Sequence, residues 1–206
     1  MSGTSRTRSR RAGGAKRSLV LDHVAAVLAD RGHAGTRFAD VAAASGVAVS
    51  TLQGYFGSRE DMLIEAFDRA TSVAVTAMDE FAAQFDDPWE QLVAMVDRGL
   101  TTDVATWRML MEFWTAAAHD AELRGQAAAL AEQYRGPFAD AVQRGVDSGA
   151  FAPRFATAAV VEVLVANIVG LLYPVVLGQL DPQDTGYREV VLAQLEFALN
   201  PTPRER

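Results

Sequence analysis

Apolar side chains recur at helical spacing along most of the chain, and no stretch alternates between apolar and polar residues as a half-buried strand does. The first apolar stripe spans residues 16–31 and ends at Gly32, a residue that commonly terminates helices. Further helices are predicted at residues 58–85, 91–101, 104–118, 122–148, 155–180 and 185–199. The pattern predicts an all-α fold.

Two short helices with a turn between them are predicted before residue 58. Phe38 and Val41 share one face of the first, and Ser45-Gly46-Val47 then interrupts it. The second runs from Ala48 to Tyr55 with Leu52 directed inward, which leaves a small, polar face outside. Two helices joined by a short glycine-containing turn form a helix-turn-helix, whose second helix enters the DNA major groove.

Several residues are typical of helix boundaries and breaks. Ser58 can cap the helix that follows the helix-turn-helix, with Asp61 completing a capping box. Asp87 is expected to cap the next helix, with Pro88 at its first position. Pro137 should kink or split the helix at 122–148, and residues 155–180 should break near Gly170 and Pro174.

One run of residues has a familiar order and spacing. It comprises Gly46-Val47, Thr51-Leu52, Tyr55-Phe56, Ser58-Arg59-Glu60 and Leu63. This run resembles the DNA-binding segment of tetracycline-repressor-like (TetR family) transcriptional regulators, and the resemblance extends over roughly residues 16–67. The chain departs from the family pattern in four places, with Gln53 for the usual Tyr, Gly54 for an aromatic residue, Arg59 for Lys, and Ala48 for Ser or Thr. These departures affect which operator is read.

The resemblance implies a set of DNA contacts. Guanidinium and hydroxyl groups at helix starts suit phosphates, whereas side chains in the middle of the second helix can meet base edges. We therefore expect phosphate contacts from Arg37, Ser50, Thr51, Tyr55 and Arg59, and base contacts from Val49 and Gln53. The complete expected DNA-binding set is Arg17, Thr36, Arg37, Ala48, Val49, Ser50, Thr51, Gln53, Tyr55 and Arg59.

Three regions are expected along the chain. Residues 1–15 lack large apolar side chains after Met1 and should form a disordered basic arm, either a solubilising tail or an arm that follows DNA. Residues 16–57 should form the DNA-binding domain. Residues 58–206 should form a connector helix and a bundle for ligand binding and dimerisation.

The charge distribution agrees with DNA at one end only. The chain carries a net charge of −7, which by itself argues against a nucleic-acid partner. Residues 1–59, however, hold nine Lys and Arg against three Asp, a net +6, so the remaining residues carry −13. A basic head on an acidic body is expected where only the head meets phosphates.

A cytoplasmic location is expected. The chain has no cysteine, which excludes disulfides, and no apolar signal segment follows the basic N-terminus. Residues 155–180 are apolar enough to suggest a transmembrane helix. Glu162, Asn167 and Pro174 interrupt that stretch and basic flanks are lacking, so we favour the centre of a helical bundle.

No enzyme or metal site is predicted. The chain has no phosphate-binding glycine loop, no nucleophile elbow and no paired histidines, and His23, His33 and His119 stand alone. Adjacent acids such as Asp86 and Asp87 lie at helix starts, where capping explains them. We therefore expect no catalytic residue, no metal and no cofactor.

Two tasks are implied by the resemblance for the C-terminal bundle. A hydrophobic or aromatic effector would be bound by large apolar side chains together with a few polar groups. The candidates are Trp107, Met111, Trp114, Tyr134, Phe138, Asn167 and Tyr173. Aromatic and Met side chains at helical spacing are, however, more often part of an ordinary core. A homodimer would bury the surplus apolar surface of the last two helices, with candidates Val161, Leu164, Val165, Ile168, Leu172, Leu192 and Leu195.

The sequence thus predicts a transcriptional regulator, with repression as the more expected sign. A palindromic DNA operator, a small-molecule effector and a second copy of the chain are its expected partners. The alternative is a helical small-molecule-binding protein or a nucleoid-type structural DNA binder that reads no specific operator. A membrane-associated protein is a more distant alternative.

Overall fold

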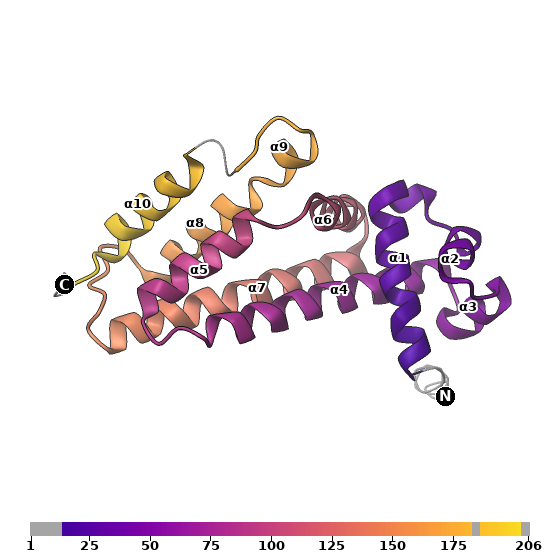
Figure 1. The fold of residues 1–206 in the computed structure, drawn as a ribbon, viewed down its shortest axis with the longest axis horizontal. Helices are drawn as coiled ribbons and strands as arrows, with labels where there is room; N and C mark the ends of the chain where they lie inside the picture. The colour runs from indigo at the N-terminus through magenta and orange to yellow at the C-terminus, as the bar shows by residue number, and fades with distance from the viewer. Residues whose placement is uncertain (1–13, 183–185, 203–206) are drawn as a thin grey trace. The chain divides into compact units, whose positions relative to one another are not determined.

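The computed structural model describes residues 14–182 and 186–202 of the chain. Apart from one isolated bridge between Phe151 and Pro201, the regular structure of these ranges is helical (Figure 1), which confirms the all-α prediction. The helices are α1 (Gly14–Gly35), α2 (Phe38–Ser45), α3 (Val49–Phe56), α4 (Arg59–Ala82), α5 (Pro88–Leu100), α6 (Val104–Ala117), α7 (Ala121–Asp147), α8 (Thr157–Val169), α9 (Leu172–Val176) and α10 (Tyr187–Leu199). The predicted basic arm lies outside the described residues except for its last two positions.

The predicted helix starts are confirmed by their capping bonds. The backbone N–H of Asp61 donates to Ser58 Oγ at 3.0 Å, which caps α4. Asp87 Oδ1 accepts from the backbone N–H groups of Trp89 at 2.8 Å and Glu90 at 3.0 Å, with Pro88 as the first residue of α5. Each cap satisfies backbone donors that a helix start leaves without an intrahelical partner.

The predicted breaks have different outcomes. Helix α1 loses helical geometry at Gly32 (φ 70°, ψ 172°), and α8 ends at Val169, directly before Gly170, as expected. Helix α7 continues through Pro137, so of the predicted kink or split, the split does not occur. A proline interrupts only one hydrogen bond of the helix, and the burial of Pro137 and Phe138 offsets that loss.

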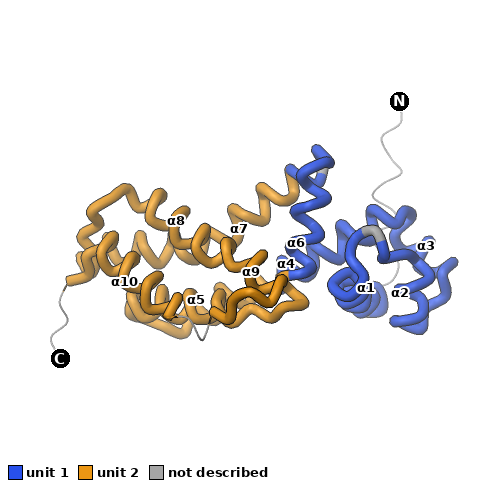
Figure 2. Tube along the Cα trace, turned by 90° about the horizontal axis from the view of Figure 1, so that it is seen from above, with its two compact units in different colours: residues 1–73, 108–124 blue, residues 74–107, 125–206 orange. Residues whose placement is uncertain are grey.

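The chain divides into two compact units (Figure 2). Unit 1 contains residues 1–73 and 108–124, and unit 2 contains residues 74–107 and 125–206. In unit 1, α1 packs on α2 and α2 on α3. The core beneath these helices includes Val24, Val41, Leu52, Phe56, Met62, Phe67 and Phe113, and the rings of Phe67 and Phe113 stack with their centroids 3.4 Å apart.

In unit 2, α8 packs against α10, and both contact α5. Its core includes Leu92, Met95, Val96, Phe138, Val142, Ile168, Leu172 and Leu199. Arg188 of α10 also binds Asp97 of α5, with Nη2 and Oδ2 at 2.9 Å. Apolar burial and this ion pair together hold α10 to the unit.

Candidate DNA-binding surface

The outward face of α3 consists of small or polar side chains. Leu52 and Phe56 are buried in unit 1, which turns the rest of the helix toward solvent. Of the residues predicted to contact DNA, the exposed ones on or next to α3 are Ala48, Val49, Ser50, Thr51 and Gln53, and Tyr55 is half-buried. The helix therefore presents a narrow surface with one long polar side chain, that of Gln53.

The turn before α3 is short because Gly46 ends α2 in the left-handed conformation (φ 69°, ψ 11°). Its N–H donates to the carbonyl of Ala42 at 3.0 Å, which closes the end of α2. Two residues later, Ala48 is the extended N-cap of α3. A glycine at this place satisfies the left-handed geometry without strain, and thereby sets the direction in which α3 leaves the turn.

The residues at the start of α2 differ in exposure. Arg37 is exposed, and its backbone N–H donates to Asp40 Oδ2 at 3.0 Å. Thr36 is fully buried, and its hydroxyl donates to the carbonyl of Gly32 at 2.8 Å. Arg37 is thus free to reach a ligand at the surface, whereas the side chain of Thr36 stabilises the turn between α1 and α2.

Arg17 and Arg59 are engaged within unit 1. Arg59 donates from Nε to the carbonyl of Thr36 at 2.6 Å and from Nη2 to the carbonyl of His33. Arg17 donates from Nη2 to Glu65 Oε1 at 2.6 Å and to the carbonyl of Tyr55 at 3.3 Å. Both guanidinium groups therefore bind backbone carbonyl oxygens at the ends of the helix-turn-helix.

Glu112 is a further residue at this site, and the sequence pattern did not indicate it. Its Oε2 accepts the backbone N–H of His33 at 2.6 Å, so α6 contacts the turn between α1 and α2. The two residues are 79 positions apart, and a single glutamate in an amphipathic helix has no local signature. Only the tertiary structure brings this carboxylate to the turn.

Comparison with protein families identifies this arrangement. Residues 20–66 match the model of bacterial regulatory proteins of the tetR family, and residues 88–199 match that of the C-terminal part of BetI-type transcriptional repressors. The second match alone covers more than half of the chain. The chain belongs to the TetR family of transcriptional regulators. A comparison with curated proteins finds no match.

Solved structures of transcriptional regulators share the fold. A TetR-family regulator from Rhodococcus sp. is 20% identical with a TM-score of 0.76, over 89% of this chain and 98% of that one. A regulator from Saccharomonospora viridis in complex with choline is 22% identical, TM-score 0.74, over 87% and 93%. FadR from Bacillus subtilis in complex with stearoyl-CoA is 18% identical, TM-score 0.72, over 89% and 98%.

Family membership also answers the question of catalysis. TetR-family proteins are regulators and not enzymes, which confirms the prediction of a non-enzyme. Within residues 14–182 and 186–202, no group of three His, Asp or Glu side chains is arranged to hold a metal ion. The chemistry of this TetR-family regulator is therefore that of binding.

The predicted effector-binding residues divide between the two units. Met111 and Trp114 belong to unit 1, whereas the other five belong to unit 2. In unit 2, Trp107 and Phe138 are buried, and the ring of Tyr134 lies 5.6 Å from that of Phe138. Burial raises the pKa of Tyr134 to about 12. Its neutral hydroxyl can donate a hydrogen bond.

The remaining two effector candidates are on helices α8 and α9. Asn167 donates from Nδ2 to Gln194 Oε1 at 3.1 Å, and its backbone carbonyl accepts the hydroxyl of Tyr187 at 2.7 Å. Tyr173 is exposed. Unit 2 thus brings together Tyr134 and Phe138, and the contacts of Asn167 are with α10.

The predicted dimer residues lie mainly in the core of unit 2. The buried ones are Val161, Leu164, Ile168, Leu172 and Leu195, and the half-buried ones are Val165 and Leu192. The exposed large apolar side chains around the same helices are Phe155, Val163, Val190 and Phe197. The surplus apolar surface therefore exists, but mostly on neighbouring positions of α8 and α10.

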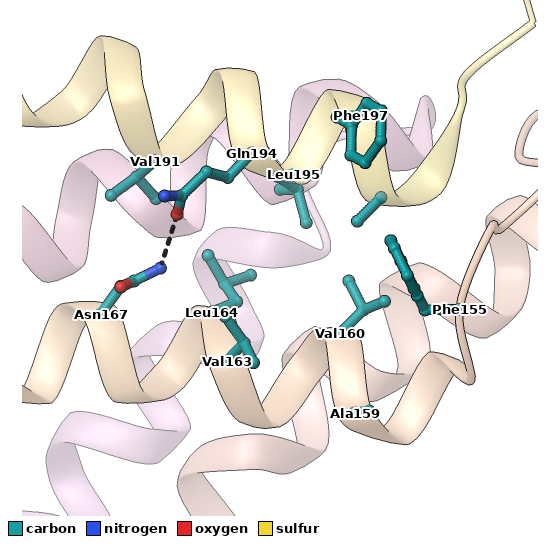
Figure 3. A pocket seen from close by; sticks show the side chains of 11 residues that line it. Phe155, Ala159, Val160, Val163, Leu164, Asn167, Val191, Gln194, Leu195 and Phe197 are labelled. Atoms are coloured by element: carbon teal, nitrogen blue, oxygen red, sulfur yellow. Dashed lines mark hydrogen bonds between the residues drawn. The ribbon is translucent and has the colours of Figure 1, made fainter.

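Part of this surface is a groove between α8 and α10 (Figure 3). Its volume is about 480 Å³, and it is lined by Phe155, Ala159, Val160, Val163, Leu164, Asn167, Val191, Gln194, Leu195, Phe197 and Ala198. The bonded amides of Asn167 and Gln194 lie toward one end, and the rings of Phe155 and Phe197, 6.3 Å apart, toward the other. Apart from the two amides, the lining side chains are apolar.

The apolar stretch Thr157–Val176 is long enough to cross a membrane. In this soluble TetR-family regulator it is a core segment, since Val160, Leu164, Ile168 and Leu172 on it are buried in unit 2. The interpretation of this stretch as a bundle helix agrees with its packing.

Proposed function

We propose that this TetR-family regulator is a cytoplasmic repressor that binds a palindromic operator as a homodimer and is released by an apolar effector. Residues 16–57 serve as the DNA-binding domain, with residues 1–15 as a basic arm before it. Residues 58–206 provide the connector helix, the effector site and the dimer interface. The exposed face of α3, held outward by buried Leu52 and Phe56, is the observation on which the proposal depends.

The proposed DNA contacts follow from the exposure of that face. Val49 and Gln53 meet base edges, while Arg37, Ser50 and Thr51 hold phosphates, because short hydroxyl side chains and an exposed guanidinium fit the backbone. Ala48 and the half-buried Tyr55 complete the surface at the two ends of α3.

The experiment is selection of bound duplexes from a random DNA pool by the full-length protein. We expect a two-fold symmetric consensus whose half-sites are about one helical turn apart, since a symmetric dimer presents two equivalent recognition helices. Recovery of unrelated sequences with equal affinity would instead favour the structural DNA binder, and recovery of no DNA would favour a binding protein without DNA function.

Replacing Gln53 with alanine should relax base preference at one position of each half-site. A glutamine amide pairs bidentately with adenine N6 and N7, and such a pair contributes roughly 1–3 kcal/mol of discrimination. The selection is repeated with Gln53→Ala and with Ser50→Ala as a control, for which we expect weaker binding but the same consensus. An unchanged consensus for Gln53→Ala would remove Gln53 from base readout.

The proposed effector is apolar or aromatic. Support comes from the aromatic side chains of Trp107, Tyr134 and Phe138 in unit 2, together with the Tyr134 hydroxyl as a hydrogen-bond donor. Met111 and Trp114 of α6 belong to unit 1 and are not part of this proposal. B. subtilis FadR is in complex with stearoyl-CoA, which carries a long apolar chain, so acyl-CoA esters are the first candidates to titrate. The S. viridis regulator is in complex with choline, which serves as the cationic comparison.

Tyr134→Phe should weaken the response to the effector without changing operator affinity in its absence. The variant removes one hydroxyl donor and keeps the ring, and a buried hydrogen bond contributes about 1 kcal/mol, so the half-saturating effector concentration should rise about fivefold. The measurement is operator binding across an effector titration, with Tyr173→Phe as the exposed control. Equal curves for Tyr134→Phe and wild type would exclude the hydroxyl from the site.

The proposed dimer buries the groove between α8 and α10 against the same face of a second copy. An isologous interface requires a surface that is complementary to itself, and an apolar face without charged side chains meets that condition.

A further inference from the structure

We propose that Arg17 and Arg59 are positioning residues, which hold the two ends of the helix-turn-helix by donating to backbone carbonyl oxygens and do not neutralise DNA phosphates. Arg59 holds the segment where the chain enters α2, and Arg17 holds it where the chain leaves α3. The inference rests on the proposed operator binding and gives these two residues a role within it.

Arg59 lies at the first position of α4, and its side chain turns back to the α1–α2 turn. The donor nitrogens Nε and Nη2 reach the carbonyls of Thr36 and His33, and Nη1 lies 3.2 Å from Glu60 Oε1. All three guanidinium nitrogens thus have partners in the protein, and the side chain is 24% exposed. The planar fork of arginine suits this use, because one group spans two carbonyls at once.

Arg17 plays the matching part at the other end of the segment. Its Nη2 donates to the carbonyl of Tyr55 in the last turn of α3, and the guanidinium lies 5.2 Å from the ring centroid of Phe56. Glu65 of α4 holds the same nitrogen with an Oε2 contact of 2.5 Å. With 13% of its side chain exposed, Arg17 fastens the end of α3 to α4 through Glu65.

The carbonyl of Tyr55 is one of the last four carbonyls of α3, for which the helix itself provides no N–H donor. A cationic side chain near the C-terminal end of a helix is also electrostatically favourable. In the α1–α2 turn, the carbonyl of His33 accepts the backbone N–H of Thr36 at a long 3.4 Å. Arginine side chains therefore bring strong donors to carbonyl oxygens that the ends of the segment leave weakly bonded. Losing either arginine should let one end of the segment move relative to α4 and misplace the face of α3.

This role predicts a different response to salt from that of a phosphate contact. Each phosphate neutralised by a cationic side chain adds about 0.9 to the slope of log K against log salt concentration, and a dimer counts each residue twice. An arginine whose charge is already paired with Glu65 or Glu60 releases no counterion from DNA. Its loss should reduce affinity for the operator and leave the slope unchanged.

The experiment uses the full-length protein with two duplexes, the operator obtained by selection and a shuffled duplex of equal length. Arg17→Gln and Arg59→Gln remove the charge and keep one amide donor. For each we expect operator affinity to fall tenfold or more, affinity for the shuffled duplex to stay within about threefold, and both salt slopes to match the wild type. Arg37→Gln, an exposed arginine, should instead reduce both slopes by about two per dimer.

Arg69→Gln is the matched control. Arg69 is also on α4 and its Nε donates to Asp22 at 2.8 Å, but its bonds do not involve the helix-turn-helix, so binding should equal the wild type. If Arg17→Gln fails to fold, Arg17→Lys is used in its place. Lysine keeps the positive charge beside Glu65 but lacks the planar guanidinium group with its several donors. Positioning predicts a weaker operator complex for that variant, and a phosphate contact predicts wild-type binding.

Two results would overturn the inference. One is a Gln variant whose salt slope falls by about two and whose affinity falls equally for both duplexes, which would make the arginine a phosphate contact. The other is wild-type operator affinity in the folded Gln variant, which would leave it without a role. Failure of the proposed function looks different, since the wild-type protein would then select no operator at all.

Discussion

Replacing Val163 with glutamate should convert the proposed dimer into a folded monomer that binds its operator at least a hundredfold more weakly. Val163 is 59% exposed and lines the apolar groove between α8 and α10. A glutamate there costs little in the monomer, where its carboxylate faces water. In the dimer the same carboxylate would be unpaired in an apolar contact, which is strongly unfavourable. A monomer has a single DNA-binding domain and therefore loses the gain in operator affinity that comes from two linked domains, a factor of about 10²–10⁴.

The adjacent residue provides the contrast. Leu164 is 3% exposed and Ile168 is fully buried, so Leu164→Glu or Ile168→Glu should unfold unit 2, because each places a charge in the core. Sedimentation velocity gives the mass of each variant and circular dichroism its folded state. A Val163→Glu protein that still sediments as a dimer would show that the interface lies elsewhere, and a monomeric wild type at micromolar concentration would remove the dimer from the proposal.

This pair of neighbours illustrates what the sequence could predict of the interface. Helix α8 is apolar on nearly all sides. Its periodicity therefore indicates that the helix is buried, but it does not indicate which side packs on its own unit and which side is left for a second copy. Leu164 and Ile168, which the apolar pattern indicates as interface residues, are buried within unit 2, and Leu164 also lines the groove. Which side is free depends on how α8 packs in the tertiary structure, and no local pattern contains that information.

The helix-turn-helix was more predictable, because its signals are local. Leu52 points inward while Val49, Ser50 and Gln53 face out, as the spacing within eight residues indicated. The end of α2 at Gly46 and the cap of α4 at Ser58 are likewise local, because each depends on a hydrogen bond to a residue three or four positions away.

The arginines of the same domain were not predictable in this way. The acceptors of Arg59 and Arg17 lie as far as 26 and 48 positions away. A long side chain can reach many partners, so sequence position alone could not distinguish a phosphate from a carbonyl oxygen.

Replacing Gly32 with alanine should destabilise unit 1 by about 2.5–6 kcal/mol. Its backbone (φ 70°, ψ 172°) lies in a region that is nearly confined to glycine, and holding another residue there costs about 1–3 kcal/mol. A Cβ at this position would also lie 3.2 Å from the carboxyl carbon and both oxygens of Glu112. The carboxylate would have to shift away from the backbone N–H of His33, which loses a charged hydrogen bond of about 1.5–3 kcal/mol.

Chemical denaturation of three variants separates these two costs. Gly46→Ala is the control, since Gly46 also has a positive φ but its Cβ would meet open space, and we expect a loss of about 1–2 kcal/mol. In a Glu112→Ala background, Gly32→Ala should retain only the backbone cost, so the two substitutions should be less than additive. The carbonyl that Arg59 binds belongs to the same residue, His33, so operator affinity should fall together with stability. Full additivity of the two substitutions would mean that the Glu112 carboxylate does not contact the turn in solution.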